Sequence, residues 1–210
     1  MKIRKYPQSH LVITGSSTKI IIDPGSITFT AGYKSEEFQG ADAYLITHQH
    51  SDHMDPENIK NIINDKLVYG NSDVVSKLKS LGVEAEETHD KEKFQVGEFE
   101  ITPIDLPHCK MQDGSDGPPN TGFIINGVLF HPGDGYQRPD DLTVENLALP
   151  IAGPTITMDG ALQFAKDLEA KIVIPIHYDY FKADPNEFKN MALPFGIEVR
   201  PLAPGEETEI

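Results

Sequence analysis

The stretch YLITHQHSDHMDP, residues 44–56, concentrates side chains that bind metal ions. Three histidines and two aspartates fall within the eight positions from His48 to Asp55. Imidazole and carboxylate groups together suit zinc, iron or manganese, and zinc is the most common ion at histidine-rich hydrolytic sites. The alternative is a polar loop without a ligand, but the pattern HxHxDH is far more specific than most short motifs. The pattern therefore predicts a metal site.

The spacing divides this motif into two pairs. In an extended segment that leaves a strand, residues i and i+2 point the same way, so His48 and His50 can bind one ion. Asp52 and His53 follow where the chain turns into a helix, so they can face a second ion. The motif alone thus offers ligands to two neighbouring ions.

Three polar residues elsewhere lie at the C-terminal ends of predicted strands, as the HxHxDH motif does. His108 follows ITPIDLP, Asp134 ends VLFHPGD and His177 ends KIVIPIH. A lone histidine is more often structural, but residues at the ends of separate strands can converge on one edge of a sheet. We therefore expect these three residues to join the HxHxDH motif at one site.

Strands and helices alternate along the chain, which predicts sheets covered by helices in an α/β layered domain. The predicted strands are HLVIT, TKIIIDPG, ADAYLIT, KLVYG, KFQVGEFEITPIDL, TGFIING, VLFHPGD, LALPI, KIVIPIH and IEVRPL. The predicted helices are DPENIKNII, SDVVSKLKSLG, MDGALQFAKDLEA and PNEFKNMAL. Asp55 and Ser72 are the expected N-caps of the first two helices, and Asn126-Gly127 predicts a β-hairpin. We expect a single domain over residues 1–210.

Composition narrows the class of protein. The chain has 210 residues, of which 38% are hydrophobic and 24% charged, and Cys109 is its one cysteine, so no internal disulfide is expected. A formal net charge of -15 disfavours nucleic-acid binding. With no secretory leader and no run of about 18 apolar residues, we expect a cytoplasmic protein without membrane contact. Its expected partner is a small-molecule substrate, and the sequence leaves the oligomeric state open.

The order of these residues resembles the metallo-β-lactamase-fold superfamily. Its signature is an Asp after an early strand, then HxHxDH, a later His, a later Asp and a final His. This chain offers Asp23 in IIIDPG, residues 48–53, His108, Asp134 and His177 in that order, over most of its length. The resemblance implies a four-layer αββα sandwich of two packed sheets with flanking helices.

The resemblance also implies two divalent metal ions, most often Zn²⁺, with Mn²⁺ or Fe²⁺ as alternatives. The implied ligands are His48, His50 and His108 on one ion, Asp52, His53 and His177 on the other, and Asp134 bridging both. Asp23 either supports the ligand loop by hydrogen bonds or serves only as a turn residue before Pro24.

Within the superfamily, THQHSDHMD, PNTGFIINGVLFHPGD and IPIHYDYF are most similar to compact metal-dependent hydrolases related to ascorbate-6-phosphate lactonase. The chain lacks the length for a nuclease cap domain or for a long C-terminal helical domain like that of glyoxalase II. Two features depart from relatives. Gly135 stands where they usually carry Thr, and the loop HCKMQDGSDGPP looks short.

Two neighbouring divalent ions lower the pKa of a shared water from about 15.7 toward 7 and polarise the bond to be cleaved. We therefore expect hydrolysis of an ester, lactone, amide or phosphodiester bond in a small cytoplasmic substrate. Asp52 is expected to accept or orient a proton of the bridging water, and Tyr178 or Tyr180 to donate a hydrogen bond to the substrate or leaving group. Cys109 is expected to point away from the site and pack.

Three other histidines carry weaker expectations. His131 precedes Asp134 by three positions and either supports the site or packs. His10 begins the first predicted strand and resembles a histidine of relatives, while His89 lies in a charged loop and is expected to be exposed.

Two alternative functions compete with hydrolysis. The same fold hosts di-iron oxidoreductases, but those relatives carry Glu where this chain has His50, and they have an attached flavin domain. A non-catalytic, metal-binding regulatory role is disfavoured because all the expected ligands are present, whereas degenerate relatives usually lose some.

Overall fold

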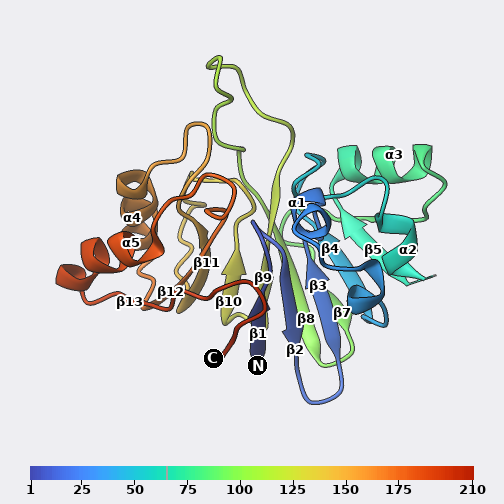
Figure 1. The fold of residues 1–210 in the computed structure, drawn as a ribbon, viewed down its shortest axis with the longest axis horizontal. Helices are drawn as coiled ribbons and strands as arrows, with labels where there is room; N and C mark the ends of the chain where they lie inside the picture. The colour runs from blue at the N-terminus through green and yellow to red at the C-terminus, as the bar shows by residue number, and fades with distance from the viewer. Residues whose placement is uncertain (65) are drawn as a thin grey trace.

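Two β-sheets pack face to face in the computed structural model, which describes residues 1–64 and 66–210. Each sheet has seven strands, and helices cover the outer face of both (Figure 1). The predicted αββα sandwich is therefore confirmed. Among the described residues, no helix combines the length and apolar character needed to cross a membrane.

The first sheet combines antiparallel and parallel pairing. In spatial order its strands are β14 (Glu207–Glu209), β1 (Lys2–Lys5), β2 (Leu11–Thr14), β3 (Lys19–Ile22), β4 (Ala43–Ile46), β5 (Leu67–Gly70) and β6 (Glu86–Glu87). The pairs from β14 to β3 are antiparallel, and those from β3 to β6 are parallel. Because β3 and β4 run in parallel, the segments that follow them lie at the same sheet edge.

The second sheet also combines parallel and antiparallel pairing. Its strands are β13 (Glu198–Val199), β12 (Ile172–Ile176), β11 (Asn146–Pro150), β10 (Leu129–His131), β9 (Thr121–Ile125), β8 (Phe99–Asp105) and β7 (Phe94–Val96). The pairs from β13 to β10 are parallel, and those from β10 to β7 are antiparallel. The β9–β10 hairpin turns at Asn126 and Gly127, both with positive φ (52° and 66°), as the NG dipeptide predicted.

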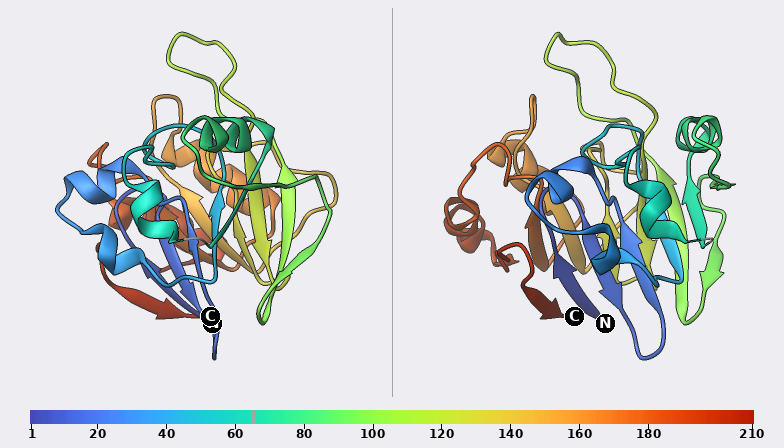
Figure 2. Two further views of the ribbon diagram at one scale, coloured as in Figure 1. Left: turned by 90° about the vertical axis from the view of Figure 1, so that its right-hand side faces the viewer. Right: turned by 45° about the vertical axis from the view of Figure 1, so that its right-hand side comes forward.

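The helices form two separate outer layers. The first sheet is covered by α1 (Ser26–Thr30), the 3₁₀ helix η1 (Ser35–Phe38), α2 (Ile59–Ile63) and α3 (Ser72–Ser80). The second is covered by α4 (Met158–Asp167), α5 (Pro185–Ala192) and the 3₁₀ helix η2 (Leu193–Phe195). The two layers lie on opposite sides of the sandwich in Figures 1 and 2.

Side-chain alternation along the strands separates three apolar layers. In β2, Leu11 and Ile13 belong to the cluster between the two sheets, whereas Ile21 of β3 packs toward α2 and α3 with Tyr44. A third cluster joins the second sheet to α4 and α5, where Phe164 and Phe188 are buried. The burial of both faces explains the continuous apolar runs of the central strands.

The start of α2 and the N-cap of α3 differ from the positions predicted from the sequence. The side chain of Asp55 does accept hydrogen bonds from the backbone N–H groups of Glu57 and Asn58, but these residues form turns and α2 begins at Ile59. The N-cap of α3 is Asn71, whose side chain accepts from Val74 N, so the cap lies one residue before Ser72. The strands β1, β6 and β14 and the short α1 were not predicted; they are polar or short and lack a clear apolar period.

Candidate metal centre

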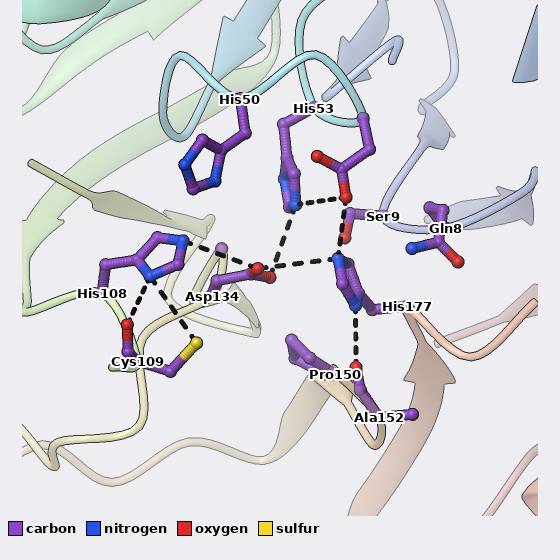
Figure 3. A network of polar contacts seen from close by, with 12 residues as sticks. Gln8, Ser9, His50, His53, His108, Cys109, Asp134, Pro150, Ala152 and His177 are labelled. Carbon is purple, nitrogen blue, oxygen red and sulfur yellow. Dashed lines mark hydrogen bonds and ion pairs between the residues drawn. The ribbon is translucent and has the colours of Figure 1, made fainter. Parts of the chain in front are cut away.

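The residues predicted to bind metal meet at one edge of the sandwich. They follow β4, β8, β10 and β12, so both sheets contribute. Figure 3 shows His53, His108 and His177 turned toward Asp134 from three different segments. The convergence follows from topology, because these strands end at the same side of the two packed sheets.

His48, His50 and His108 form a first group of possible ligands. One ring nitrogen from each lies within 4.8 Å of the others, and His48 Nε2 is 3.1 Å from His50 Nδ1. His48 is buried and only 4% of the His108 side chain is exposed, whereas His50 is partly exposed, so this group opens to solvent at His50. Burial lowers the pKa of His48, and the neighbouring His53 lowers it further, which favours the neutral imidazole that binds metals.

Asp52, His53 and His177 form a second group within the same 4.8 Å limit. His177 Nε2 lies 3.2 Å from Asp52 Oδ2, and His53 Nε2 lies 3.9 Å from the same oxygen. Asp134 stands between the groups, with its carboxylate oxygens 3.4 Å from His53 Nε2, 3.5 Å from His177 Nε2 and 3.7 Å from His108 Nε2.

In His53, His108 and His177 the second ring nitrogen is held by the protein, which turns the first nitrogen toward the centre. His53 Nδ1 is 2.7 Å from Asp23 Oδ2, and His177 Nδ1 is 2.7 Å from the carbonyl of Ala152. His108 Nδ1 similarly lies 2.6 Å from the Cys109 carbonyl. This is the arrangement by which proteins orient histidine ligands.

The donor set fits a divalent cation on grounds internal to the structure. Within residues 1–64 and 66–210, His53 Nε2, His108 Nε2 and Asp134 Oδ1 are buried and have no hydrogen-bond partner. Burial disfavours a charged imidazole, but Asp134 and Asp23 raise the pKa of His53 well above its usual value. Burial likewise disfavours an ionised Asp134, yet His177 and His53 hold the pKa of that carboxyl well below its usual range. The centre therefore stabilises positive charge between carboxylates, as a cation site must.

Asp23 supports this centre, which decides between its two predicted roles. Its Oδ1 accepts from the backbone N–H of Thr47 at 2.8 Å, and its Oδ2 accepts from the Thr47 hydroxyl at 2.7 Å. The same carboxylate faces His53 Nδ1, so Asp23 fixes both the start of the ligand loop and one imidazole.

Asp134 is held by a buried side chain that the sequence did not single out. Asn120 Oδ1 accepts from the Asp134 backbone N–H at 3.1 Å, and its Nδ2 donates to the Pro132 carbonyl at 2.9 Å. Gly135 follows, and a Cβ there would lie 2.4 Å from Leu106 Cγ. Glycine thus suits this position because the Leu106 side chain already fills the space that a side chain at residue 135 would occupy.

The family follows from sequence comparison. A sequence profile of the β-lactamase superfamily domain matches residues 2–177. The chain belongs to the metallo-β-lactamase-fold hydrolase superfamily. A UPF0173 metal-dependent hydrolase of Pyrococcus abyssi is 31% identical, with 100% of each chain covered. A second one, from Methanocaldococcus jannaschii, is 30% identical, with 83% of this chain and 86% of that protein covered.

Fold comparison agrees with this assignment. The structure of a metallo hydrolase from Ignicoccus hospitalis superposes with a TM-score of 0.76 at 23% identity, and the match covers 100% of this chain and 98% of that one. The protein is therefore a metal-dependent hydrolase of the metallo-β-lactamase fold, and the family implies divalent metal.

In this hydrolase, hydrogen bonds made by Lys5 and Gln8 of the N-terminal segment hold the loop that carries His177; we call this set of contacts the N-terminal clamp. The Gln8 carbonyl accepts from His177 N at 3.0 Å, and Gln8 Oε1 accepts from Tyr180 N at 3.0 Å. Asp179 Oδ2 accepts from the Gln8 backbone N–H at 2.8 Å and pairs with Lys5 Nζ at 2.7 Å. Gln8 and His177 both have φ near +60°, a strained conformation for residues other than glycine that the clamp sustains.

Lys5 is the least expected member of this clamp, because its side chain is 0% exposed. Its ammonium also donates to the Tyr6 carbonyl and lies 4.5 Å from the centre of the Tyr178 ring. Burial lowers the pKa of Lys5, and Asp179 opposes this shift. One signal was present in the sequence: Lys5 lies two positions after the buried Ile3 in β1, so both side chains lie on the same, inner face.

The structure does not bring Tyr178 to the centre. Its hydroxyl donates to the Leu202 carbonyl at 2.7 Å, and its ring packs in the cluster under α4 and α5. Burial raises its pKa, which further disfavours a role as proton donor. The expected hydrogen bond from Tyr178 to a substrate does not fit this position. Tyr180 is exposed beside Phe181.

Cys109 departs from its expected orientation. Its Sγ lies 3.6 Å from His108 Nδ1 and lines the cavity beside the centre, so the expectation that it points away is wrong. The reason is local: Cys109 N donates to the Asp134 carbonyl at 2.7 Å, and the chain is not regularly extended there. Burial, together with Asp134, raises the pKa of the thiol to about 11, which leaves it a poor nucleophile.

The remaining histidines are structural or exposed. His131 Nε2 lies 3.0 Å from the Ser9 carbonyl and its Nδ1 accepts from Gly133 N, so it links β10 to the N-terminal segment. His10 is buried with Nδ1 3.0 Å from the Thr28 hydroxyl, and burial lowers its pKa to about 3. His89 is 63% exposed, as predicted.

We expect Gly25→Ala to disturb the ligand loop strongly. A Cβ on Gly25 would lie 1.7 Å from the Asp52 carbonyl oxygen and 2.7 Å from His53 N, so the backbone that carries both side chains must move. We expect a loss of more than about 2 kcal/mol in the free energy of unfolding, measured with denaturant. Gly160→Ala is the matched control, because its Cβ would meet only Thr157 Oγ1 at 3.3 Å in helix α4. Equal stability of the two variants would contradict the close approach.

Proposed function

We propose that this hydrolase uses two divalent ions, zinc most readily, to cleave an ester, lactone, amide or phosphodiester bond in a small molecule. One observation carries the proposal: two groups of three nitrogen or oxygen donors lie side by side, with Asp134 between them. Paired donor sets that share one carboxylate are the usual design of two-metal hydrolytic centres.

Each residue has a separate task in this proposal. His48, His50 and His108 would hold one ion, Asp52, His53 and His177 the other, and Asp134 both. Ions at such a site lower the pKa of water toward neutrality and polarise the oxygen of the bond to be cleaved. Asp52 is 28% exposed at its side chain and lines the cavity, so it can also accept a proton from the attacking water.

The protein must keep these groups fixed while the reaction proceeds. Asp23, Asn120 and Gln8 hold the HxHxDH loop, Asp134 and the His177 loop respectively, through contacts of 2.7 to 3.1 Å. Rigid support of this kind lowers the reorganisation needed in the transition state. Cys109 and Tyr178 have no catalytic task in this scheme.

Metal analysis tests the proposal directly. After reconstitution with zinc or manganese, we expect about two ions per chain by mass spectrometry and hydrolysis of at least one activated ester or phosphodiester. A chelator should abolish the hydrolysis, and added metal should restore it. Fewer than about one bound ion per chain, together with no metal-restored hydrolysis, would refute the proposal.

A further inference from the structure

A cavity of about 260 Å³ lies beside the candidate metal centre. Ring nitrogens and carboxylates of the centre line one side of it. The remaining lining residues are Ser51, Cys109, Lys110, Met111, Pro154 and Phe181. Pockets for drug-sized ligands are usually about 300 to 1,000 Å³, so this cavity suits a small substrate.

Met111, Pro154 and Phe181 form an apolar wall of this cavity. Phe181 stacks on the His177 ring with centroids 5.4 Å apart and planes inclined by 27°, and 37% of the residue is exposed. Met111 and Pro154 complete this surface from two other loops. An exposed aromatic ring beside a polar centre favours contact with an apolar group of the substrate.

Apart from the proposed metal ions, the described residues of this cavity offer an anionic substrate a single cationic side chain. Of the residues that the structure describes, Lys110 is the one Lys or Arg in the lining, and its ammonium already pairs with Asp116. Proteins that bind phosphate groups usually add Arg, Lys or helix N-termini to any metal. The lining therefore disfavours a phosphate ester relative to an uncharged carbonyl compound.

The apolar wall is tied to the centre. The loop between β8 and β9, which carries Lys110 and Met111, rises above the sandwich in Figures 1 and 2. Its base is fixed because Cys109 N donates to the Asp134 carbonyl at 2.7 Å. The Thr155 hydroxyl donates to the Lys110 carbonyl at 2.5 Å and so joins this loop to the one that carries Pro154.

We propose that the substrate is a small, uncharged carboxylic ester or lactone whose apolar group packs against Phe181 and Met111, in preference to a phosphodiester. This inference rests on the proposed hydrolytic function. In the reaction, the oxygen of water bonds to the carbonyl carbon, and the bond from that carbon to the leaving oxygen breaks with its electron pair. The leaving oxygen takes one proton from the water, so an ester gives a carboxylic acid and an alcohol, and a lactone gives a single hydroxy acid.

Three nitrophenyl substrates test this assignment on the metal-loaded full chain. We expect kcat/KM to rise about tenfold from p-nitrophenyl acetate to the butyrate, since each buried methylene contributes about 0.8 kcal/mol. Bis(p-nitrophenyl) phosphate should be hydrolysed with a lower kcat/KM than either ester. A phosphodiester preferred over both esters, or no gain from acetate to butyrate, would overturn the assignment.

Variants of the wall sharpen the test. Phe181→Ala should lower kcat/KM about tenfold for the butyrate and less than about threefold for the acetate. Phe181→Leu keeps an apolar side chain and should therefore retain most of the preference for butyrate over acetate. Lys110→Gln is the charge control and should leave all three substrates within about threefold of the unaltered protein. A loss confined to the phosphodiester in Lys110→Gln, or equal losses for both esters in Phe181→Ala, would contradict the proposal.

Metal content, measured for each variant, shows whether a negative result contradicts only the proposed substrate class or also the proposed two-metal hydrolase. Hydrolysis that favours the phosphodiester at full metal content would refute the substrate class and leave the metallo-hydrolase proposal intact. No hydrolysis of any of the three by a metal-loaded chain would count against both.

Discussion

Replacement of Asp134 by asparagine is expected to reduce bound metal from about two ions per chain to one or fewer, and to lower kcat/KM by about a thousandfold or more. The Asp134 carboxylate lies within 3.7 Å of Nε2 of His53, His108 and His177, so it is the group that both donor sets share. Asparagine keeps its shape but removes one anionic oxygen and introduces an amide that would face these nitrogens.

The comparison must separate loss of metal from loss of fold. The backbone contact from position 134 to Asn120 Oδ1 does not involve the altered side chain, so we expect a folded protein by circular dichroism. Asp159→Asn provides a matched control, because Asp159 lies exposed in the first turn of α4 and does not belong to the lining of the cavity beside the centre. If Asp134→Asn bound two ions and retained activity like this control, the proposed bridging role would be wrong.

The second large effect is expected at Lys5. Lys5→Met should lower the free energy of unfolding by about 3 kcal/mol and weaken metal binding at the side of the centre that includes His177. The substitution preserves apolar volume but leaves the Asp179 carboxylate, 18% exposed, without its cation. Since Asp179 also accepts from Gln8 N, which belongs to the segment that holds His177, the disturbance reaches a proposed ligand.

Denaturant unfolding of the metal-free protein and metal titration of the folded protein measure these two effects separately. The double variant Lys5→Met/Asp179→Asn removes both charges, so its stability should recover by about 1 kcal/mol or more relative to Lys5→Met alone. Lys93→Met is the surface control, because the Lys93–Glu100 pair is 58% and 46% exposed and should contribute less than about 1 kcal/mol. A merely structural Lys5 would lower stability with no change in metal affinity.

The elements of this fold were largely predictable because their signals are local. Apolar runs such as ADAYLIT and KIVIPIH became β4 and β12, and the NG dipeptide became the β9–β10 turn. The helix starts were predicted less well: Asn71, not Ser72, caps α3, because either side chain satisfies the local pattern and only tertiary contacts select one. Asn71 also donates to the Thr47 carbonyl, a contact between distant segments.

The direction in which a side chain points was less predictable from sequence than which segments meet at the site. The thiol of Cys109 was expected to point away and instead lines the cavity, because the backbone at this position pairs with Asp134 rather than continuing a regular strand. The position of Tyr178 next to His177 made a catalytic role reasonable from sequence. The left-handed turn at His177, with φ of 60°, separates the two side chains, and the Tyr178 hydroxyl contacts Leu202.

By itself, the sequence determined the layered α/β class and the residue types that gather at one sheet edge, because strand periodicity and the HxHxDH spacing are properties of neighbouring residues. Only the tertiary structure decided which other groups hold these metal-binding residues in place. Lys5 and Asp179 are 174 positions apart, and Asp23 and His53 are 30 apart. The first contact forms when the two sheets pack together and the second when β3 pairs with β4 in one sheet, so no local pattern encodes either. The apolar wall of Met111, Pro154 and Phe181 arises in the same way, from three loops that meet only in the folded chain.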